Sequence, residues 1–435
     1  MTLTKYLWAA QQPTADGQAC EKGGRGVAYA AGYFFHVVIT TYDMLKVEGR
    51  RLSAVPWQYL VVDEAQRLKN LASRSRAIVS SLKFEQLALL TGTPIQNSTA
   101  ELFSLLNLLN PDKYHDADAF AERFGEVKSG EQVEALQALL KPIMLLRRKV
   151  DVLKDEVPEK EETIVYVELT GQQKKLYRAI LDKNIRLLAA STNGSSARPS
   201  TSVPSLSNVC MQLRKLCNHP RLLEREDRPM PDASAAAEEL RAIVSESGKM
   251  VLLAKLLPRL RDEGRKVLVF SQFTKMLDLL EDYLTLATYP FERLDGSVAG
   301  KERQAAIDRF QHGATADAFV FLLSTRAGGV GINLTAADTV VIFDSDWNPQ
   351  NDVQGMARCH RIGQTQQVRV YRLITAKTYE RAMFDRACLK LSLDHAVLGG
   401  GGSSKDAKEK EKEPSQAELS KLLRYGAYEV MRDDE

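Results

Sequence analysis

An acidic pair follows a short apolar run in the first quarter of this sequence. Asp63 and Glu64 come directly after Tyr59–Val62, a run typical of a buried strand. A carboxylate at a strand end can hold Mg²⁺, which prefers hard oxygen ligands and keeps several waters, and a neighbouring carboxylate can orient or deprotonate an attacking water. The alternative is an acidic pair that begins a helix, where the helix dipole favours negative charge.

Two arginines stand three residues apart in the last quarter of the sequence. Arg358 and Arg361 follow Asn348–Pro349 in a polar stretch that we expect to be helical, so they should share one face of the helix. Two guanidinium groups on one face could clamp a transferring phosphate. A solvated arginine pair on a surface helix is the alternative.

The stretch before these arginines predicts the edge of a parallel sheet. Two apolar runs, Ala318–Leu323 and Thr339–Phe343, are typical of buried strands, and each ends in polar residues. Between them, the glycine-rich turn Gly328–Gly331 could let the backbone approach a ligand closely. Loops at the carboxyl ends of parallel strands are where α/β folds bind ligands, so we expect the arginines beside a binding edge.

Similar units recur on both sides of this stretch. Further strands are predicted at Phe34–Thr41, Leu87–Leu90, Lys266–Phe270 and Val368–Ile374, with a short one at Phe291–Leu294. Periodicity predicts helices around 102–109, over most of 115–190, and at 208–223, 276–283, 302–310 and 379–395. Strands that alternate with helices in this way predict two α/β domains with parallel sheets.

Length and composition fit a globular protein of several domains. The chain has 435 residues, of which 44% are hydrophobic and 26% charged, enough for two or three cores. A net charge of +3 does not by itself indicate a nucleic-acid partner, so any basic surface must be local. The five cysteines form no CxxC pair, and no apolar run approaches the length of a membrane span. We therefore expect a reducing compartment and no membrane partner.

Several stretches together resemble the motifs of the Swi/Snf-type helicase-like ATPases. They are Asp63–Asn70 (DEAQRLKN), Thr91–Asn97 (TGTPIQN), Lys266–Phe273 (KVLVFSQF) and Ser324–Gln364, which ends in RCHRIGQ. Gln66 stands where this family usually has histidine. The late segment Leu422–Met431 (LLRYGAYEVM) is similar to one that follows the ATPase in chromodomain–helicase–DNA-binding remodellers.

The resemblance implies two RecA-like lobes with ATP between them, the first lobe incomplete, together with helical insertions and a helical tail at the C-terminus. Asp63 would then hold magnesium through water, Glu64 would activate the attacking water, and Arg358 and Arg361 would be arginine fingers. The implied ATP-binding residues are Gly329, Gly331 and Gln354. The implied DNA-binding residues are Thr91, Asn97, Ser271, Gln272, Ser324, Arg326, Trp347 and Asn348.

The same resemblance implies the partners and the compartment. They are double-stranded DNA held through its phosphates, the nucleosome with its histones, further remodeller subunits, and the nucleus. We expect the following division of the chain: an incomplete first lobe at 1–150, a helical linker region at 151–247 with a disordered insertion at 191–207, a second lobe at 248–398, a flexible linker at 399–414 and a helical segment at 415–435.

One motif expected of such a motor is missing from the sequence. A P-loop needs glycines and a Lys-Ser/Thr pair at set spacing, and no GxxxxGK[ST] occurs here. We therefore expect a motor truncated at its N-terminus that hydrolyses ATP weakly or not at all alone. Two alternatives remain: a pseudo-ATPase that binds DNA or chromatin as a scaffold, and a DNA-repair translocase of the same broad family.

Overall fold

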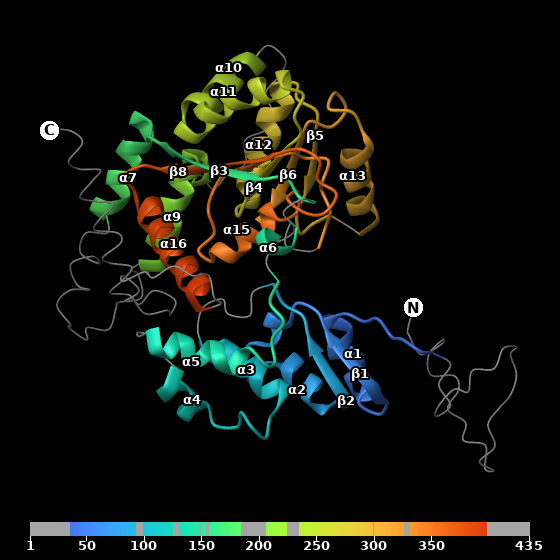
Figure 1. Ribbon diagram of the computed structural model, residues 1–435. Helices are drawn as coiled ribbons and strands as arrows, with labels where there is room; N and C mark the ends of the chain where they lie inside the picture. The colour runs from blue at the N-terminus through green and yellow to red at the C-terminus, as the bar shows by residue number, and fades with distance from the viewer. Residues whose placement is uncertain are drawn as a thin grey trace, which may run out of the picture. The chain divides into compact units, whose positions relative to one another are not determined.

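The computed structural model describes residues 35–92, 99–124, 130–147, 149–153, 156–183, 206–223, 235–298, 300–325 and 331–397 (Figure 1). The expected flexible linker at 399–414 and the helical segment at 415–435 lie outside these residues. The expected insertion at 191–207 also lies outside them up to residue 205, and Leu206 begins a helix.

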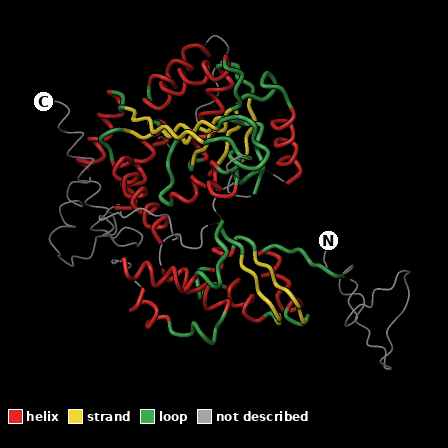
Figure 2. The backbone as a smooth tube through the Cα atoms, viewed as in Figure 1, coloured by secondary structure: helices red, strands yellow, loops and turns green. Residues whose placement is uncertain are grey.

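The chain divides into two compact units. The first consists of Met1–Pro94 and Glu101–His115, and the second of Ile95–Ala100 and Asp116–Glu435. Each contains parallel strands together with helices, which confirms the predicted α/β class (Figure 2). Among the described helices, none is long and apolar enough to cross a membrane.

The first unit contains a two-stranded parallel sheet. Its elements are α1 (Tyr42–Leu52), β1 (Pro56–Val62), η3 (Ala65–Leu68), α2 (Arg74–Ser81), β2 (Lys83–Leu89) and α3 (Thr99–Leu109). The register places Val62 opposite Leu89, so both strands end at the same edge. Buried side chains from the helices and strands form a small core, but Tyr59 and Val61 of β1 remain 66% and 59% exposed.

The prediction of a strand at Phe34–Thr41 is wrong. In the described part, residues 35–41, the backbone has no regular structure, and Val37 and Ile39 are 76% and 92% exposed. The described sheet of this unit contains only β1 and β2, so these β-branched residues join no ladder. Thr41 instead caps helix α1, because its hydroxyl accepts a hydrogen bond from the Met44 amide.

The second unit contains a six-stranded parallel sheet with the order β3-β8-β7-β4-β6-β5 (Figures 1 and 2). Its strands are β3 (Lys160–Val167), β4 (Val267–Ser271), β5 (Phe291–Leu294), β6 (Val320–Ser324), β7 (Thr339–Ile342) and β8 (Val368–Thr375). Its helices are α4 (Ala117–Phe124), α5 (Gly130–Leu140), α6 (Lys149–Val152), α7 (Gly171–Lys183), α9 (Leu206–Asn218), η4 (Pro220–Leu223), α10 (Ala236–Ser245), α11 (Gly248–Asp262), α12 (Thr274–Leu286), α13 (Gly300–His312), α15 (Pro349–Met356) and α16 (Tyr379–Val397). From β4 to β8, the described elements follow the predicted order strand–helix–strand–helix–strand–strand–helix–strand.

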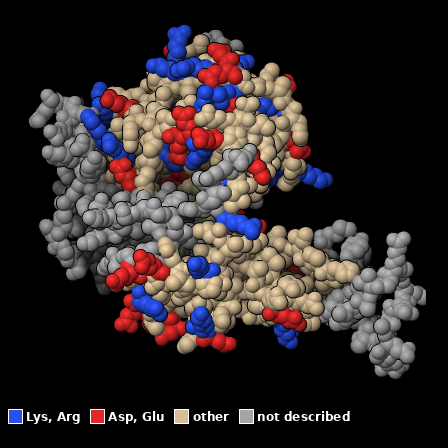
Figure 3. All heavy atoms as spheres, in the orientation of Figure 1, with Lys and Arg blue, Asp and Glu red and all other residues tan. Residues whose placement is uncertain are grey.

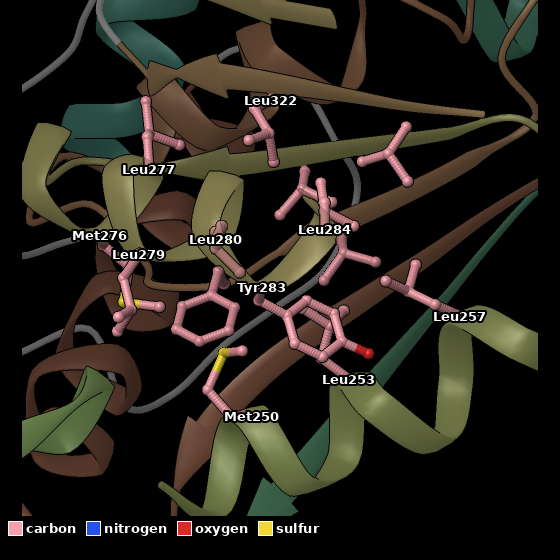
Figure 4. Close-up of a cluster of buried hydrophobic side chains, with 14 of the residues drawn as sticks. Met250, Leu253, Leu257, Met276, Leu277, Leu279, Leu280, Tyr283, Leu284 and Leu322 are labelled. Carbon is pink, nitrogen blue, oxygen red and sulfur yellow. The ribbon is translucent and has the colours of Figure 1, made fainter. Parts of the chain in front are cut away.

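Both faces of the sheet are buried at its central strands β4, β6 and β7, which explains why these are continuous apolar runs. Along β4, Val267 and Val269 belong to one core cluster, and Leu268 and Phe270 belong to the other. The first cluster contains Leu322 of the sheet together with side chains of helices α11 and α12, and the labelled residues of α11 lie around Tyr283 of α12 (Figure 4). The sheet is therefore packed on both faces beneath the loops at its carboxyl edge.

The expectation of mostly helical structure over 115–190 is wrong at residues 160–167. These residues form β3, which pairs with β8 along its whole length. The strand lies at the sheet edge and is largely exposed, so charged residues occupy its first half and weaken the apolar signal. The sheet of the second unit thus takes a strand from the range 151–247, which we expected to be a helical linker region.

Candidate functional site

The acidic pair occupies the turn that follows β1. Asp63 and Glu64 are both exposed, and Glu64 adopts a left-handed backbone with φ of 51°. A carboxylate oxygen of Asp63 accepts the Glu64 amide at 2.9 Å. The Tyr42 hydroxyl donates to the backbone oxygen of Asp63 at 2.9 Å, which ties the turn to α1.

Gln66 joins this turn to the loop after β2. Its Nε2 donates to Oε2 of Glu64 at 2.5 Å, and its Oε1 accepts the hydroxyl of Thr91 at 2.8 Å. The two loops are also linked by the backbone, because the Ala65 amide donates to the Leu90 carbonyl at 2.9 Å. Gln66 therefore orients the side chain of Glu64 and is itself held by Thr91 in the loop after β2.

In the second unit, Asp344 organises two loops at the carboxyl edge of the sheet. It follows β7 and is 3% exposed. Its carboxylate accepts the Ser271 hydroxyl, the Gln272 amide at 2.9 Å and Nδ2 of Asn218 at 3.1 Å. Burial raises the pKa of this carboxyl, while Lys249 and the hydrogen bonds act in the opposite direction.

Lys249 supplies the cation of this buried network. Its Nζ contacts Oδ1 of Asn218 at 3.0 Å, the carbonyl of Phe343 at 2.8 Å and Oε1 of Glu380 at 2.5 Å. Lys249 and Glu380 are 0% and 4% exposed as side chains, so both ions depend on one another for compensation. The network joins α9, α11, α16 and the end of β7.

Arg358 and Arg361 do not share a helix face, which corrects the helical prediction. Helix α15 ends at Met356, and the chain then makes consecutive turns through both arginines. The carbonyl of Arg358 accepts the Leu334 amide at 3.0 Å, so the first arginine is anchored to the preceding loop. Arg358 is 9% exposed, and Arg361 is partly exposed.

A segment distant in sequence contacts these turns. Nζ of Lys149 donates to the carbonyl of His360 at 2.7 Å, and Nε2 of His360 lies 2.9 Å from the carbonyl of Pro158. Burial and the nearby charge of Arg361 lower the pKa of Lys149. Burial likewise lowers the pKa of His360. Cationic groups therefore gather around the arginine turns.

On the face drawn in Figure 3, the surface of the described residues shows no gathering of cationic groups like the one around the arginine turns. There, the described Lys and Arg side chains of the second unit are interspersed with Asp and Glu. This mixing agrees with the small net charge of +3. Recognition of an anionic ligand would therefore rest on local groups at the sheet edge.

Other predicted site residues occupy the same edge of the second unit. Ser271 and Ser324 lie opposite each other at the ends of β4 and β6, and both are buried. Trp347 packs against the cluster formed by α7 and α9, and the Asn348 side chain caps α15. Gln354 lies on α15 and is partly exposed.

Predicted residues in the glycine-rich loops are only partly described. Gly331 has φ of 50°, a left-handed conformation that favours glycine. Gly329, Arg326 and Asn97 lie outside the described residues. The ligand roles given to all of these site residues stay predictions.

The acidic turn has the donor chemistry that magnesium prefers. Asp63 presents a carboxylate at an exposed strand end, and only one such ligand is needed beside phosphate oxygens and water. Within the described residues, no group of three or more His, Cys, Asp or Glu could hold a metal ion. Asp63 would be the protein ligand of an ion held otherwise by substrate and water.

Sequence reasoning missed the polar residues that α9 and α11 contribute. Arg214 contacts the loops after both β4 and β7, and Asn218 and Lys249 contact residues that follow β7. Arg214 and Asn218 are four residues apart on α9, so a shared helix face was readable. The partners of that face, however, lie far away in sequence.

Two domain families match this chain. Residues 29–222 match the SNF2-related domain, and residues 248–363 match the helicase conserved C-terminal domain. These matches include the acidic turn in the first range and both arginines in the second. The strand β3 falls within the first match, although its sheet belongs to the second unit.

Long proteins of one group match nearly the whole chain. It is 49% identical to human chromodomain-helicase-DNA-binding protein 7 over 95% of its length, which covers 14% of that protein. It is also 49% identical to protein 6 of the group from rat and to protein 8 from zebrafish, again over 95% of this chain and over 15% and 16% of theirs. The chain thus spans about a seventh of the length of these relatives.

A solved structure is also similar to this chain. It is the Sulfolobus solfataricus SWI2/SNF2 ATPase core in complex with dsDNA, with 28% identity and a TM-score of 0.45. The match covers 89% of this chain and 75% of that one.

Proposed function

Because the chain belongs to the SNF2-related, helicase-like ATPases, we propose that it is motor sequence of a chromatin remodeller that translocates on nucleosomal double-stranded DNA. The similarity to chromodomain-helicase-DNA-binding proteins over 95% of the chain supports a remodeller rather than a DNA-repair translocase. The proposed compartment is the nucleus, and the proposed partners are DNA, histones and further remodeller subunits.

The proposed chemistry is DNA-dependent hydrolysis of ATP. Magnesium would be held by Asp63 and would neutralise phosphate charge. Glu64 accepts a proton from the attacking water, and Gln66 holds the Glu64 carboxylate in place. Arg358 and Arg361 stabilise charge on the transferring phosphoryl group, to which cationic guanidinium groups bind strongly.

The proposed DNA contacts lie in the polar loops of both units. In the second unit they are Ser271, Gln272, Ser324, Trp347 and Asn348, together with Arg326. Contacts to phosphate position a protein on DNA without reading its sequence, which suits a motor that moves along the duplex. Thr91 of the first unit and Asn97, which follows it closely in the sequence, are the other proposed contacts.

One observation carries the proposal: Gln66 couples the proposed base, Glu64, to Thr91 in the loop that follows the next strand. This link places the acidic pair and the second motif in one hydrogen-bonded unit. A scaffold that binds chromatin without hydrolysis would have no need of such a link. The absence of GxxxxGK[ST] favours the scaffold and leads us to expect slow turnover from this chain alone.

The test compares duplex binding and ATP hydrolysis by the chain and by Arg361→Ala. We expect salt-sensitive duplex binding and slow, DNA-stimulated hydrolysis that is lost in the variant. Duplex binding without hydrolysis in a sensitive assay would support the scaffold. Failure to bind duplex DNA would contradict both functions.

A further inference from the structure

Arg214 joins the two loops that follow β4 and β7. It lies on α9, and its Nη2 donates to Oε1 of Gln272 at 2.9 Å and to the carbonyl of Ser345 at 3.2 Å. Its guanidinium also lies over the ring of Phe273, 5.6 Å from the ring centre. One side chain therefore contacts consecutive residues of the first loop and the start of the second.

The backbone of Gln272 is fixed independently of its side chain. Its amide donates to the Asp344 carboxylate, which also accepts Nδ2 of Asn218. Asn218 lies one helical turn after Arg214 on α9. The same helix therefore holds the backbone of Gln272, through Asn218 and Asp344, and its side chain, through Arg214. With the backbone held by Asp344, Arg214 is left to determine how the side-chain amide points.

The contact with Arg214 determines which end of that amide is available. A guanidinium group only donates hydrogen bonds, so it must face the oxygen of the amide and not its nitrogen. Nε2 of Gln272 is buried and has no hydrogen-bond partner among the described residues, but Gln272 as a whole is partly exposed, so a small movement of the side chain would bring Nε2 to the surface. A buried donor without an acceptor is unfavourable, and a phosphate oxygen is an acceptor that would satisfy it.

We propose that Arg214 is a positioning residue, which orients the Gln272 amide so that its NH₂ group donates to a phosphate oxygen of duplex DNA. This inference rests on the proposed function, since it concerns the same DNA-facing edge. Arg214 acts through Gln272 in this scheme and need not touch the phosphate itself.

The experiment is a double-mutant cycle on duplex binding by the intact chain. Arg214→Met, Gln272→Met and the double variant are titrated with fluorescent 30-base-pair DNA over a series of salt concentrations. Each single change should weaken binding by about tenfold, as expected for one hydrogen bond to a charged group. The double variant should bind duplex DNA with the same affinity as the single variant that binds less tightly, because both changes remove the same contact.

Two further variants separate positioning from bulk charge and from packing. Gln272→Glu keeps an acceptor for Arg214 but removes the donor, so it should bind at least as weakly as Gln272→Met while melting at the wild-type temperature. Arg259→Met removes the same charge from the exposed last turn of α11, which leads to the opposite edge of the sheet. It should leave duplex binding unchanged.

Several results would overturn the proposal. Additive effects of the two single variants would show that Arg214 acts separately from Gln272. The slope of the logarithm of the binding constant against the logarithm of salt concentration measures phosphate contacts. A slope smaller in magnitude by about 0.9 in Arg214→Met would show that Arg214 contacts phosphate directly. Unchanged binding in both single variants would remove Gln272 from the DNA site, whereas failure of the wild-type chain to bind would reject the proposed function itself.

Discussion

At the scale of single residues, the uncharged side chain of Gln66 connects the acidic turn after β1 to the loop after β2. Gln66 can donate to Glu64 and accept from Thr91 at the same time, because an amide carries both kinds of group. A histidine at this position could make the same two contacts only in one neutral tautomer. The amide therefore keeps the link independent of pH near neutrality.

The first prediction concerns this link. Gln66→Met preserves much of the side-chain volume but removes both hydrogen bonds, so it should lower the free energy of unfolding of the first unit by about 1 kcal/mol. Urea unfolding followed through Trp57 measures this, with Trp8 and Trp347 replaced by phenylalanine. The matched control is Gln58→Met on the exposed face of β1, and equal losses in the two variants would contradict the prediction.

A second prediction concerns the pH dependence of His360. Burial lowers the pKa of this imidazole, and the positive charges of Lys149 and Lys160 act in the same direction. The unfolded chain then binds more protons than the folded chain just below pH 6.5, so stability falls as the pH decreases from there through the folded pKa. Above pH 6.5 this contribution to stability is fully present.

NMR titration of the histidine Cε1 protons should give His360 a pKa below that of a free imidazole. The melting temperature of His360→Gln should fall less than that of the wild type between pH 7.5 and 5.5. If both proteins lost the same stability over this range, the charge state of His360 would not be coupled to folding.

At the scale of elements, the residue that begins helix α11 determines how closely this helix packs against the sheet of the second unit. Gly248 begins α11, and its amide donates to Oε1 of Gln173 at 3.1 Å. A Cβ atom at this position would lie 2.1 Å from the backbone oxygen of Glu168, just after β3. The glycine therefore allows α11 to approach the edge of the sheet.

The third prediction follows from this approach. Gly248→Ala should destabilise the chain by about 1–3 kcal/mol, because backbone rather than a flexible side chain must move. Gly171, the first residue of α7, has no atom within 4 Å of the corresponding Cβ position, so Gly171→Ala should be neutral or slightly stabilising. Chemical denaturation followed by circular dichroism tests both, and similar behaviour of the two variants would refute the packing argument.

At the scale of the whole molecule, the two units differ in how well their sheets are supported. The six-stranded sheet has a buried core on each face, whereas the described sheet of the first unit has two strands and exposed apolar residues. Two strands alone are marginally stable in water. The units should therefore differ in local stability even within one chain.

Hydrogen exchange on the intact chain provides the fourth prediction. Amides of β4, β6 and β7 should exchange more slowly than those of β1 and β2, by at least about tenfold, because opening them exposes both cores. Mass spectrometry of peptides from the two sheets measures the difference. Equal protection would mean that the first unit is stabilised by contacts beyond its described sheet.

The sequence alone determined the central strands and the acidic turn. Strands β4, β6 and β7 are short, almost wholly apolar runs because central strands of a parallel sheet are buried on both faces. Polar residues follow these runs, and several of them, such as Ser271 and Asp344, are buried and hydrogen-bonded to one another at the carboxyl edge. Strand β3 was missed, since an exposed edge strand tolerates charged residues such as Glu161.

Only the tertiary structure decided how the site residues are held. The end of α15 at Met356 places Arg358 and Arg361 on turns, where contacts with residues as distant as Lys149 replace helical hydrogen bonds. The contacts of Arg214 and Lys249 join segments more than fifty residues apart, and helical or strand periodicity reports only on neighbours within an element. Burial of charges in a close-packed core depends on which segments meet there, and that is a property of the folded chain.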